Sequence, residues 1–144
     1  MIEILEGTAA EFPAVEALLS QAGLPLDGLR QSGRLMVARK DGRIVGAAAL
    51  EAYEEGVLLR SVVVAEELRK SRIGQRLTYA ALAAASTMGH RSAYLLTTTA
   101  GGFFNRFGFA AIDRAEVPDD VKQSVEFTSA CPASVLVMRA PLAP

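Results

Sequence analysis

The sequence predicts a mixed α/β domain built around one central sheet, and three observations support this fold class. The middle of the chain contains apolar, β-branched segments joined by short turns, of which Asp41-Gly42 is the strongest hairpin signal. From Ile73 onward, apolar residues recur at helical spacing, and strand-like segments resume at Ala93. No linker rich in Ser, Pro or Gly interrupts the 144 residues, so we expect one domain over 1–144.

The first third of the chain predicts a strand, a helix and then a hairpin. Residues 2–5 form a short apolar run, which is typical of a strand. Thr8 followed three positions later by Glu11 fits a capping box, and the helix that it begins would end near Gly23. The two strands of the hairpin are expected over 35–39 and 43–53.

The rest of the chain alternates between strand and helix signals. The helix that begins near Ile73 would end at Gly89, a residue type suited to the left-handed conformation that often follows a helix. The other segments are expected in this order: a turn at 54–56, a strand over 57–65, then after the helix a strand over 93–98, a short helix over 101–106, a strand over 108–112, turns with one helical turn over 114–133, and a closing strand over 135–139. The expected order is therefore β-α-β-β-β-α-β-α-β-β.

Composition excludes several classes of function. The formal net charge is −1, which gives no overall attraction to nucleic acid or to an anionic membrane, so neither is expected as a partner. The single cysteine, Cys131, cannot form an internal disulfide, and together with the single histidine, His90, it makes a zinc site improbable; we expect no metal. The first residues, MIEILEGTAAEF, lack the basic start of a secretory signal, so a cytoplasmic protein is expected.

The segment 62–77, VVVAEELRKSRIGQRL, carries the clearest functional signal. An apolar strand runs into a turn that opens a helix, with Ser71 as the expected N-cap. The turn and the first helical residues carry four cations: Arg69, Lys70, Arg72 and Arg76. A helix N-terminus already attracts anions, and this excess of cations favours a bound pyrophosphate, to which Gly74 would allow close approach. The alternative is a solvated basic start of a helix.

Two motifs resemble the GNAT acyltransferases. The run 69–74, RKSRIG, resembles their Gln/Arg-x-x-Gly-x-Gly/Ala pyrophosphate loop, and 103–109, FFNRFGF, resembles their later Phe-Tyr-x-x-x-Gly-Phe segment. The resemblance extends over nearly the whole chain. The run 95–100 followed by Phe103-Phe104 is similar to the N-acetylglutamate synthase type of amino-acid N-acetyltransferase. The runs 113–118 and 126–134 resemble the arsenic-resistance N-acetyltransferases.

The resemblance implies a fold and an activity. The fold would be a GNAT-like single domain with a mostly antiparallel mixed sheet, flanking helices, and fourth and fifth strands that splay apart around the pantetheine arm of the cofactor. The activity would be transfer of the acetyl group of acetyl-CoA to the amine of a small amino-acid-like substrate, with an arsenic- or phosphorus-containing analogue as a specific candidate. A CoA-binding regulatory module without turnover and a protein acetyltransferase are the alternatives. A homodimer is a further expectation, since many relatives pair.

The resemblance also maps cofactor contacts onto this sequence. They are Val62, Val63, Val64, Arg69, Lys70, Ser71, Arg72, Ile73, Gly74, Gln75, Thr98, Asn105 and Phe107. Two positions depart from the family pattern. Arg72 stands where the loop motif has its first glycine, and Phe104 stands where many relatives carry a tyrosine that protonates the leaving thiolate. A thiol has a pKa of about 8.5, so CoA can leave as the thiolate without that acid.

Candidate residues for the acceptor side follow from a charged residue in an apolar strand. Arg60 interrupts the run 57–64, and the turn at 54–56 would place Glu51 roughly opposite it. The pair is either a cross-strand ion pair or a clamp, in which Arg60 binds a substrate carboxylate and Glu51 orients or deprotonates the amine. The Val62 N–H would hold the oxyanion. The expected substrate contacts are Arg60, Ser61, Thr97, Glu126 and Ser129; for the threonines of 97–99 the alternative roles are strand propensity and a helix cap.

Overall fold

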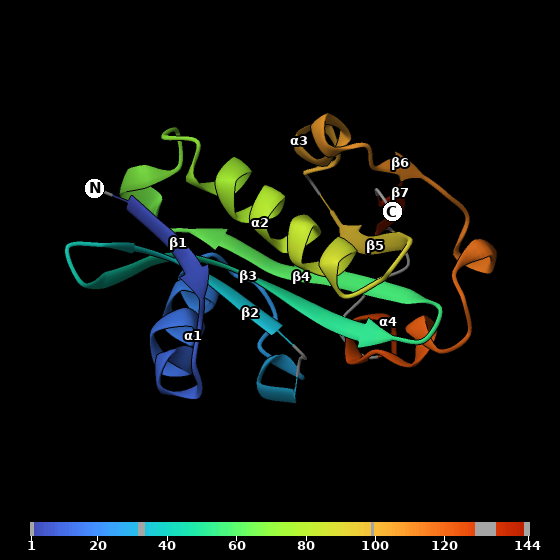
Figure 1. Ribbon diagram of the computed structural model, residues 1–144, viewed down its shortest axis with the longest axis horizontal. Helices are drawn as coiled ribbons and strands as arrows, with labels where there is room; N and C mark the ends of the chain where they lie inside the picture. The colour runs from blue at the N-terminus through green and yellow to red at the C-terminus, as the bar shows by residue number, and fades with distance from the viewer. Residues whose placement is uncertain (1, 32–33, 99, 129–134, 143–144) are drawn as a thin grey trace.

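The computed structural model describes residues 2–31, 34–98, 100–128 and 135–142, and its strands form one seven-stranded sheet (Figure 1). The strand order across the sheet is β1-β2-β3-β4-β5-β7-β6. The strands are β1 (Ile2–Glu6), β2 (Arg34–Lys40), β3 (Arg43–Tyr53), β4 (Gly56–Val64), β5 (Ser92–Thr97), β6 (Ala110–Ala111) and β7 (Leu136–Pro141). The helices are α1 (Phe12–Gln21), α2 (Ile73–Thr87), α3 (Gly101–Phe104) and α4 (Val125–Thr128), and short 3-10 turns cover Ala9–Glu11, Leu29–Gln31, Glu66–Leu68, Asn105–Phe107, Arg114–Glu116 and Val121–Gln123.

Local signals explain the first half of the fold. The capping box at Thr8 and Glu11 is present, although it opens a 3-10 turn that leads into α1. Gly23 and Gly89 adopt positive φ after α1 and α2, as helix-ending glycines do. Asp41 and Gly42 both have positive φ, so the β2–β3 hairpin closes through the tight turn that this dipeptide favours. The predicted order of elements is confirmed, and α4 is the helical turn expected within 114–133.

Helices cover both faces of the sheet. Figure 1 shows α2 on one side and α1 and α4 on the other. The face under α2 buries one large cluster that includes Ile73, Leu77 and Leu50, whereas Val15 and Leu19 of α1 pack on the opposite face. A Cβ at Gly46 would lie 2.9 Å from a Leu77 methyl carbon, so the glycine allows α2 to approach β3 closely.

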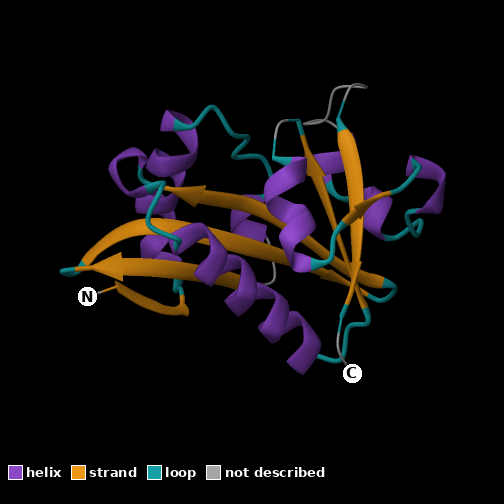
Figure 2. Cartoon of the chain, turned by 90° about the horizontal axis from the view of Figure 1, so that it is seen from above, coloured by secondary structure: helices purple, strands orange, loops and turns teal. Residues whose placement is uncertain are grey.

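The sheet divides between β4 and β5. These two strands pair in parallel, but only Val57 with Ala93 and Leu58 with Tyr94 are in register. Beyond these residues β5 continues as the partner of β7, and Figure 2 shows β5 and β7, on the right above the C-terminus, rising away from the other strands. The expected splay of the fourth and fifth strands is therefore present. Within the described residues, no helix has the length and apolarity needed to cross a bilayer.

Candidate functional site

The split in the sheet opens a cavity of about 1030 Å³. The second half of β4, over 59–64, forms one wall, and 95–98 at the end of β5 form another. The turn that leads into α2, the short helix α3 and the loop 22–25 after α1 complete the lining. A cavity of this size and position accommodates a cofactor-sized ligand.

A β-bulge shapes the β4 wall. Ala49 lies opposite Arg60 and Ala47 lies opposite Val63, so two steps on β3 correspond to three steps on β4. The extra residue lies at Ser61, whose φ is 57°. A bulge of this kind interrupts the ladder of hydrogen bonds and re-aims the chain after it.

The backbone after the bulge is directed into the split. The Ala65 N–H donates to the Val45 carbonyl of β3, so Ala65 and, two residues earlier, Val63 direct their backbone groups to β3. Val64 and Val62 alternate with these residues and direct theirs away from β3. In agreement, the Val64 carbonyl accepts a hydrogen bond from Arg69 Nε at 3.1 Å, outside the sheet. The Val62 N–H therefore lies on the edge that faces the cavity.

The N-terminus of α2 meets the other end of the cavity. Arg72 is the N-cap residue, in the left-handed conformation with φ 68°, and no side chain caps the helix. The prediction that Ser71 is the N-cap is wrong, because its hydroxyl instead donates to the Leu68 carbonyl in the preceding turn. A Cβ at Gly74 would lie 3.5 Å from Phe103 and 3.6 Å from Val64, so this glycine keeps the cavity wall open between them.

The charges around the cavity are of one sign. Five cations line it: Arg60, Arg69, Lys70, Arg72 and Arg106. None of the described lining residues is an Asp or a Glu. Arg76, the fourth cation of the predicted cluster, instead donates to the Ile2 carbonyl at 3.2 Å. Arg60 is paired with Glu51, so the uncapped helix end and the other four lining cations are what favours an anionic ligand.

The backbone of Arg72 gives a direct stability prediction. A residue with a side chain pays about 1 kcal/mol or more in the left-handed conformation, whereas glycine pays nothing. Arg72→Gly and Arg72→Ala both remove the same exposed side chain, so their difference isolates the backbone. We expect Arg72→Gly to be more stable than Arg72→Ala by about 1 kcal/mol in urea denaturation. Equal stabilities would show that this position is not left-handed in solution.

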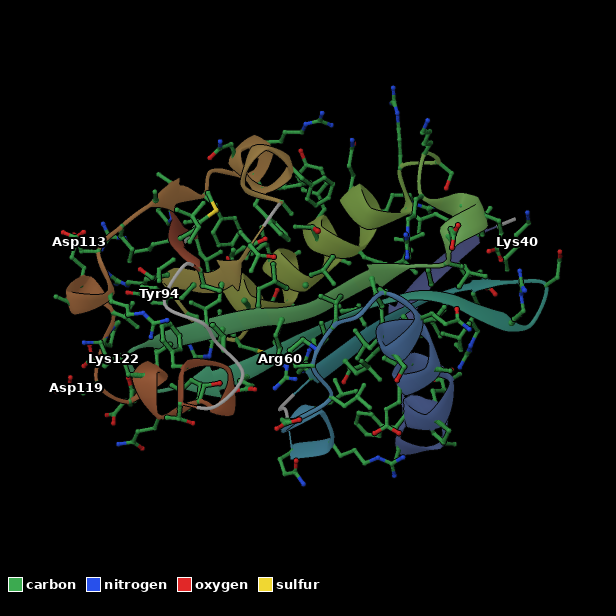
Figure 3. The ribbon with its side chains drawn as sticks, turned by 180° about the vertical axis from the view of Figure 1, so that it is seen from behind. Lys40, Arg60, Tyr94, Asp113, Asp119 and Lys122 are labelled. Atoms are coloured by element: carbon green, nitrogen blue, oxygen red, sulfur yellow. The ribbon has the colours of Figure 1, made fainter. Side chains whose placement is uncertain are left out.

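Arg60 and Glu51 form a buried ion pair beneath the bulge. Arg60 Nη1 donates to Glu51 Oε2 at 2.8 Å, and the Arg60 side chain is completely buried. Figure 3 shows Arg60 on the face of the sheet that carries α1 and α4. The predicted register is wrong, because Glu51 lies opposite Leu58 and reaches Arg60 diagonally. The turn contains only Glu54 and Glu55, which shifts the pairing relative to a longer turn.

Glu51 is held by a second partner. The Tyr53 hydroxyl donates to Glu51 Oε1 at 2.6 Å, so each carboxylate oxygen accepts a strong hydrogen bond. Glu51 does not line the large cavity; it borders a smaller hollow of about 690 Å³ with Tyr53, Asp27 and Ser124. Of the two interpretations of Arg60 and Glu51, the structure therefore contains the cross-strand ion pair.

Burial raises the pKa of Tyr53 to about 12, and the hydrogen bond to Glu51 adds to the shift. On alkaline titration the unfolded chain loses this proton first, near the ordinary tyrosine pKa of about 10. The contribution to stability is therefore complete below about pH 10 and is lost as the pH rises toward 12. We expect the free energy of unfolding to fall more steeply across this range in the wild type than in Tyr53→Phe, measured by urea denaturation. Parallel pH profiles would contradict this.

The remaining predicted residues fall into three groups. Ser61, Thr97 and Thr98 line the cavity with the valines of β4, and Thr97 Oγ1 also accepts from the Ala100 N–H at 3.0 Å. Ala100 is itself the N-cap of α3 and no side chain caps that helix, so Thr97 supports the turn before α3 and is not its cap. Ile73 is buried, Gln75 lines the cavity, and Asn105 and Phe107 lie beside the cavity in a 3-10 turn without lining it. Glu126 belongs to α4, and Ser129 and Cys131 lie outside the described residues.

Sequence reasoning missed several parts of the lining. The loop 22–25 contributes from the far side of the sheet, and Arg106 adds a cation next to the expected Asn105. The run FFNRFGF was the signal that could have identified Arg106. Phe104, which stands where a tyrosine acid is common, lines the cavity and packs against Phe103 and Phe109. Across the described residues, no group of three His, Cys, Asp or Glu side chains could hold a metal ion.

Comparison with known families gives one match over more than half of the chain. Residues 31–111 match the family model of the acetyltransferase (GNAT) domain. An uncharacterized N-acetyltransferase of Chlorobaculum tepidum is 33% identical over 86 residues, which cover 59% of this chain and 55% of the relative. The chain thus spans about half the length of the curated relative that it matches.

Solved structures share the fold. N-acetylglutamate synthase from Neisseria gonorrhoeae, in complex with coenzyme A and N-acetyl-glutamate, superposes with a TM-score of 0.83 at 18% identity, covering 100% of this chain and 36% of that one. Rv2747 from Mycobacterium tuberculosis, in complex with CoA, gives a TM-score of 0.81 at 20% identity over 98% of this chain and 99% of that one. At such identities the likeness is one of fold.

Proposed function

The chain belongs to the GNAT acetyltransferase family, and from that premise we propose that it transfers the acetyl group of acetyl-CoA to an amine. One observation carries the proposal. The cavity joins an uncapped, cation-rich helix start to an open strand edge, and none of its described lining residues is acidic. This arrangement matches a ligand with an anionic end and a long polar arm.

The pyrophosphate is proposed to bind at the start of α2. The first N–H groups of a helix have no partner within the helix, so those of Ile73, Gly74 and Gln75 are available to phosphate oxygens. Lys70 and Arg72 are exposed beside them and supply charge, and Arg69 adds a third cation. The side chain of Ile73 is buried in the core, so only its backbone serves the ligand.

The pantetheine arm is proposed to lie along β4. Its amides would pair with the backbone groups of Val62 and Val64, as an added strand would. Thr98 lies on the opposite wall. Asn105 and Phe107 lie in the 3-10 turn that follows α3, and they are proposed to contact the cofactor at the rim of the cavity. Val63 directs its backbone to β3, so its contribution is to fix the strand.

The proposed reaction follows from this position of acetyl-CoA. The amine lone pair attacks the thioester carbon, the C–O double bond opens to an oxyanion, and the N–H of Val62 stabilises that charge. The intermediate then expels CoA as the thiolate, and the amine proton passes to solvent water. Because a thiol has a pKa of about 8.5, the thiolate leaves without a tyrosine at Phe104. Holding both reactants in one cavity supplies a large part of the rate.

The acceptor class is proposed from the acceptor end of the cavity. We propose that the loop 22–25 and Val135, which line the cavity without any charged side chain, close that end around a small substrate. The fold similarity to N-acetylglutamate synthase supports an amino-acid-like amine, and the runs 113–118 and 126–134 favour an arsenic- or phosphorus-containing analogue. Ser61, Thr97, Glu126 and Ser129 remain the predicted contacts. A carboxylate clamp by Arg60 would require this buried guanidinium to leave Glu51.

Release of CoA thiol from acetyl-CoA in the presence of a panel of amines tests the proposal. The panel contains the common amino acids, their phosphorus- and arsenic-containing analogues, and a peptide with a free N-terminus. We expect at least one small amino acid or analogue to accelerate thiol release, and mass spectrometry to find the acetylated amine. Tight CoA binding with no acceleration by any amine would favour the regulatory module, and acceleration by the peptide alone would favour a protein acetyltransferase.

A further inference from the structure

A chain of polar contacts runs from the end of β3 to the bulge in β4. The Tyr53 hydroxyl donates to Glu51 at 2.6 Å, and Arg60 Nη1 donates to the other oxygen of Glu51 at 2.8 Å. Arg60 Nε then donates to Ser61 Oγ at 3.1 Å. We call Tyr53, Glu51 and Arg60, which lead to Ser61, the bulge relay.

The relay ends on Ser61, the bulge residue that determines which way the backbone groups of the following residues point. Ser61 is the extra residue of the bulge and has a positive φ, a conformation that serine does not adopt without support from its surroundings. In a regular strand the backbone N–H of Val62 would point in the same direction as that of Arg60, towards β3, where Ala49 is the partner of Arg60. The extra residue reverses this, and the Val62 N–H faces the cavity instead.

The relay is fixed, and its Tyr53–Glu51 end lies away from the large cavity, which only Arg60 and Ser61 reach. The Arg60 side chain is 0% exposed and that of Glu51 is 11% exposed, so neither is a flexible surface group. Glu51 and Tyr53 border the smaller hollow and do not line the large cavity. A direct contact of either residue with substrate in the large cavity therefore does not explain this arrangement.

We propose that Tyr53, Glu51 and Arg60 are positioning residues that hold Ser61 in its bulged conformation, so that the Val62 N–H points at the thioester carbonyl of bound acetyl-CoA. The inference rests on the proposed function, because it needs acetyl-CoA in the cavity. It differs from the clamp predicted from sequence, in which Arg60 and Glu51 touch the acceptor. A clamp would govern the KM of the amine, whereas the relay governs the polarisation of the carbonyl and kcat.

Carbon NMR of acetyl-CoA labelled with ¹³C at the carbonyl tests the relay without an acceptor. In the wild type we expect the bound carbonyl resonance to move away from that of free acetyl-CoA, because a hydrogen bond polarises the carbonyl. Ser61→Ala and Tyr53→Phe each break the relay at a different point. In both we expect the resonance to move back at least about halfway, and kcat with the best amine of the panel to fall about tenfold, less than for outright loss of an oxyanion donor. The Kd of CoA, which has no carbonyl at that point, should change less than about twofold.

Ser92→Ala and Tyr94→Phe on β5 are matched controls, since neither residue lines the cavity, and both should keep the wild-type resonance. If one relay variant fails to fold by circular dichroism, the other still decides. A resonance that is the same in the wild type and both relay variants would overturn the relay alone. Failure of the wild type to bind labelled acetyl-CoA would overturn the proposed function, and the relay with it.

Discussion

The double variant Lys70→Glu/Arg72→Glu is expected to bind CoA at least about a hundredfold more weakly than the wild type. Both residues are exposed, line the cavity and flank the uncapped start of α2. A hydrogen bond to a charged group contributes about 1.5–3 kcal/mol, and reversal replaces attraction by repulsion at two positions. A loss of about 3 kcal/mol or more corresponds to two orders of magnitude in Kd, measurable by isothermal titration calorimetry.

A second double reversal, Arg91→Glu/Arg139→Glu, controls for net charge. These two arginines are exposed and lie outside the cavity lining. Arg91 follows the far end of α2, whose 15 residues span about 22 Å, well beyond the screening length of about 8 Å at physiological salt. We expect the control to change Kd by less than about threefold. Equal weakening by both double variants would mean that overall charge, and not the start of α2, attracts CoA.

Arg60→Met is expected to lower the free energy of unfolding by about 3–5 kcal/mol. The substitution leaves the carboxylate of Glu51, with a side chain only 11% exposed, without its cationic partner. For a chain of this length, each kcal/mol corresponds to about 3 °C in Tm, so we expect a drop of roughly 10–15 °C in differential scanning calorimetry.

Adding Glu51→Leu to Arg60→Met completes the test of the ion pair. With both charges gone, no carboxylate remains buried and unpaired, so we expect the double variant to regain more than half of the lost stability. The double variant should still show impaired acetyl transfer, because Ser61 has lost its contact with Arg60. If the stability lost by the double variant equals the sum of the losses in Arg60→Met and Glu51→Leu measured separately, the pair is not coupled in solution.

The elements of the fold could be predicted because their signals are local. The turn Asp41-Gly42 specifies its hairpin, and the strand expected over 43–53 has those bounds in the structure. The apolar spacing from Ile73 gives α2, because four buried apolar residues on one face follow the helical period: Ile73, Leu77, Ala81 and Ala85. The splay of β4 and β5 followed from the resemblance of two motifs rather than from any local pattern.

The parts that escaped prediction depend on pairs of strands or on the backbone. The bulge at Ser61 is a mismatch between β3 and β4, which neither strand carries alone. The sequence predicts Glu51 opposite Arg60, but a two-residue turn shifts the register. The two side chains still meet because arginine is long enough to reach diagonally. Ser71 has the side chain of an N-cap, yet Arg72 takes the position because the preceding 3-10 turn at Glu66–Leu68 engages the serine.

The central claim is that the cations and the open N-terminus of α2 bind the anionic end of the cofactor. Calorimetric titration of the wild type with CoA and, separately, with pantetheine, which lacks the pyrophosphate and the nucleotide, tests this most directly. We expect CoA to bind with a Kd that rises steeply with added salt, and pantetheine to bind at least about a hundredfold more weakly. Equal affinities for the two compounds, or no detectable heat with CoA at millimolar concentration, would contradict the account.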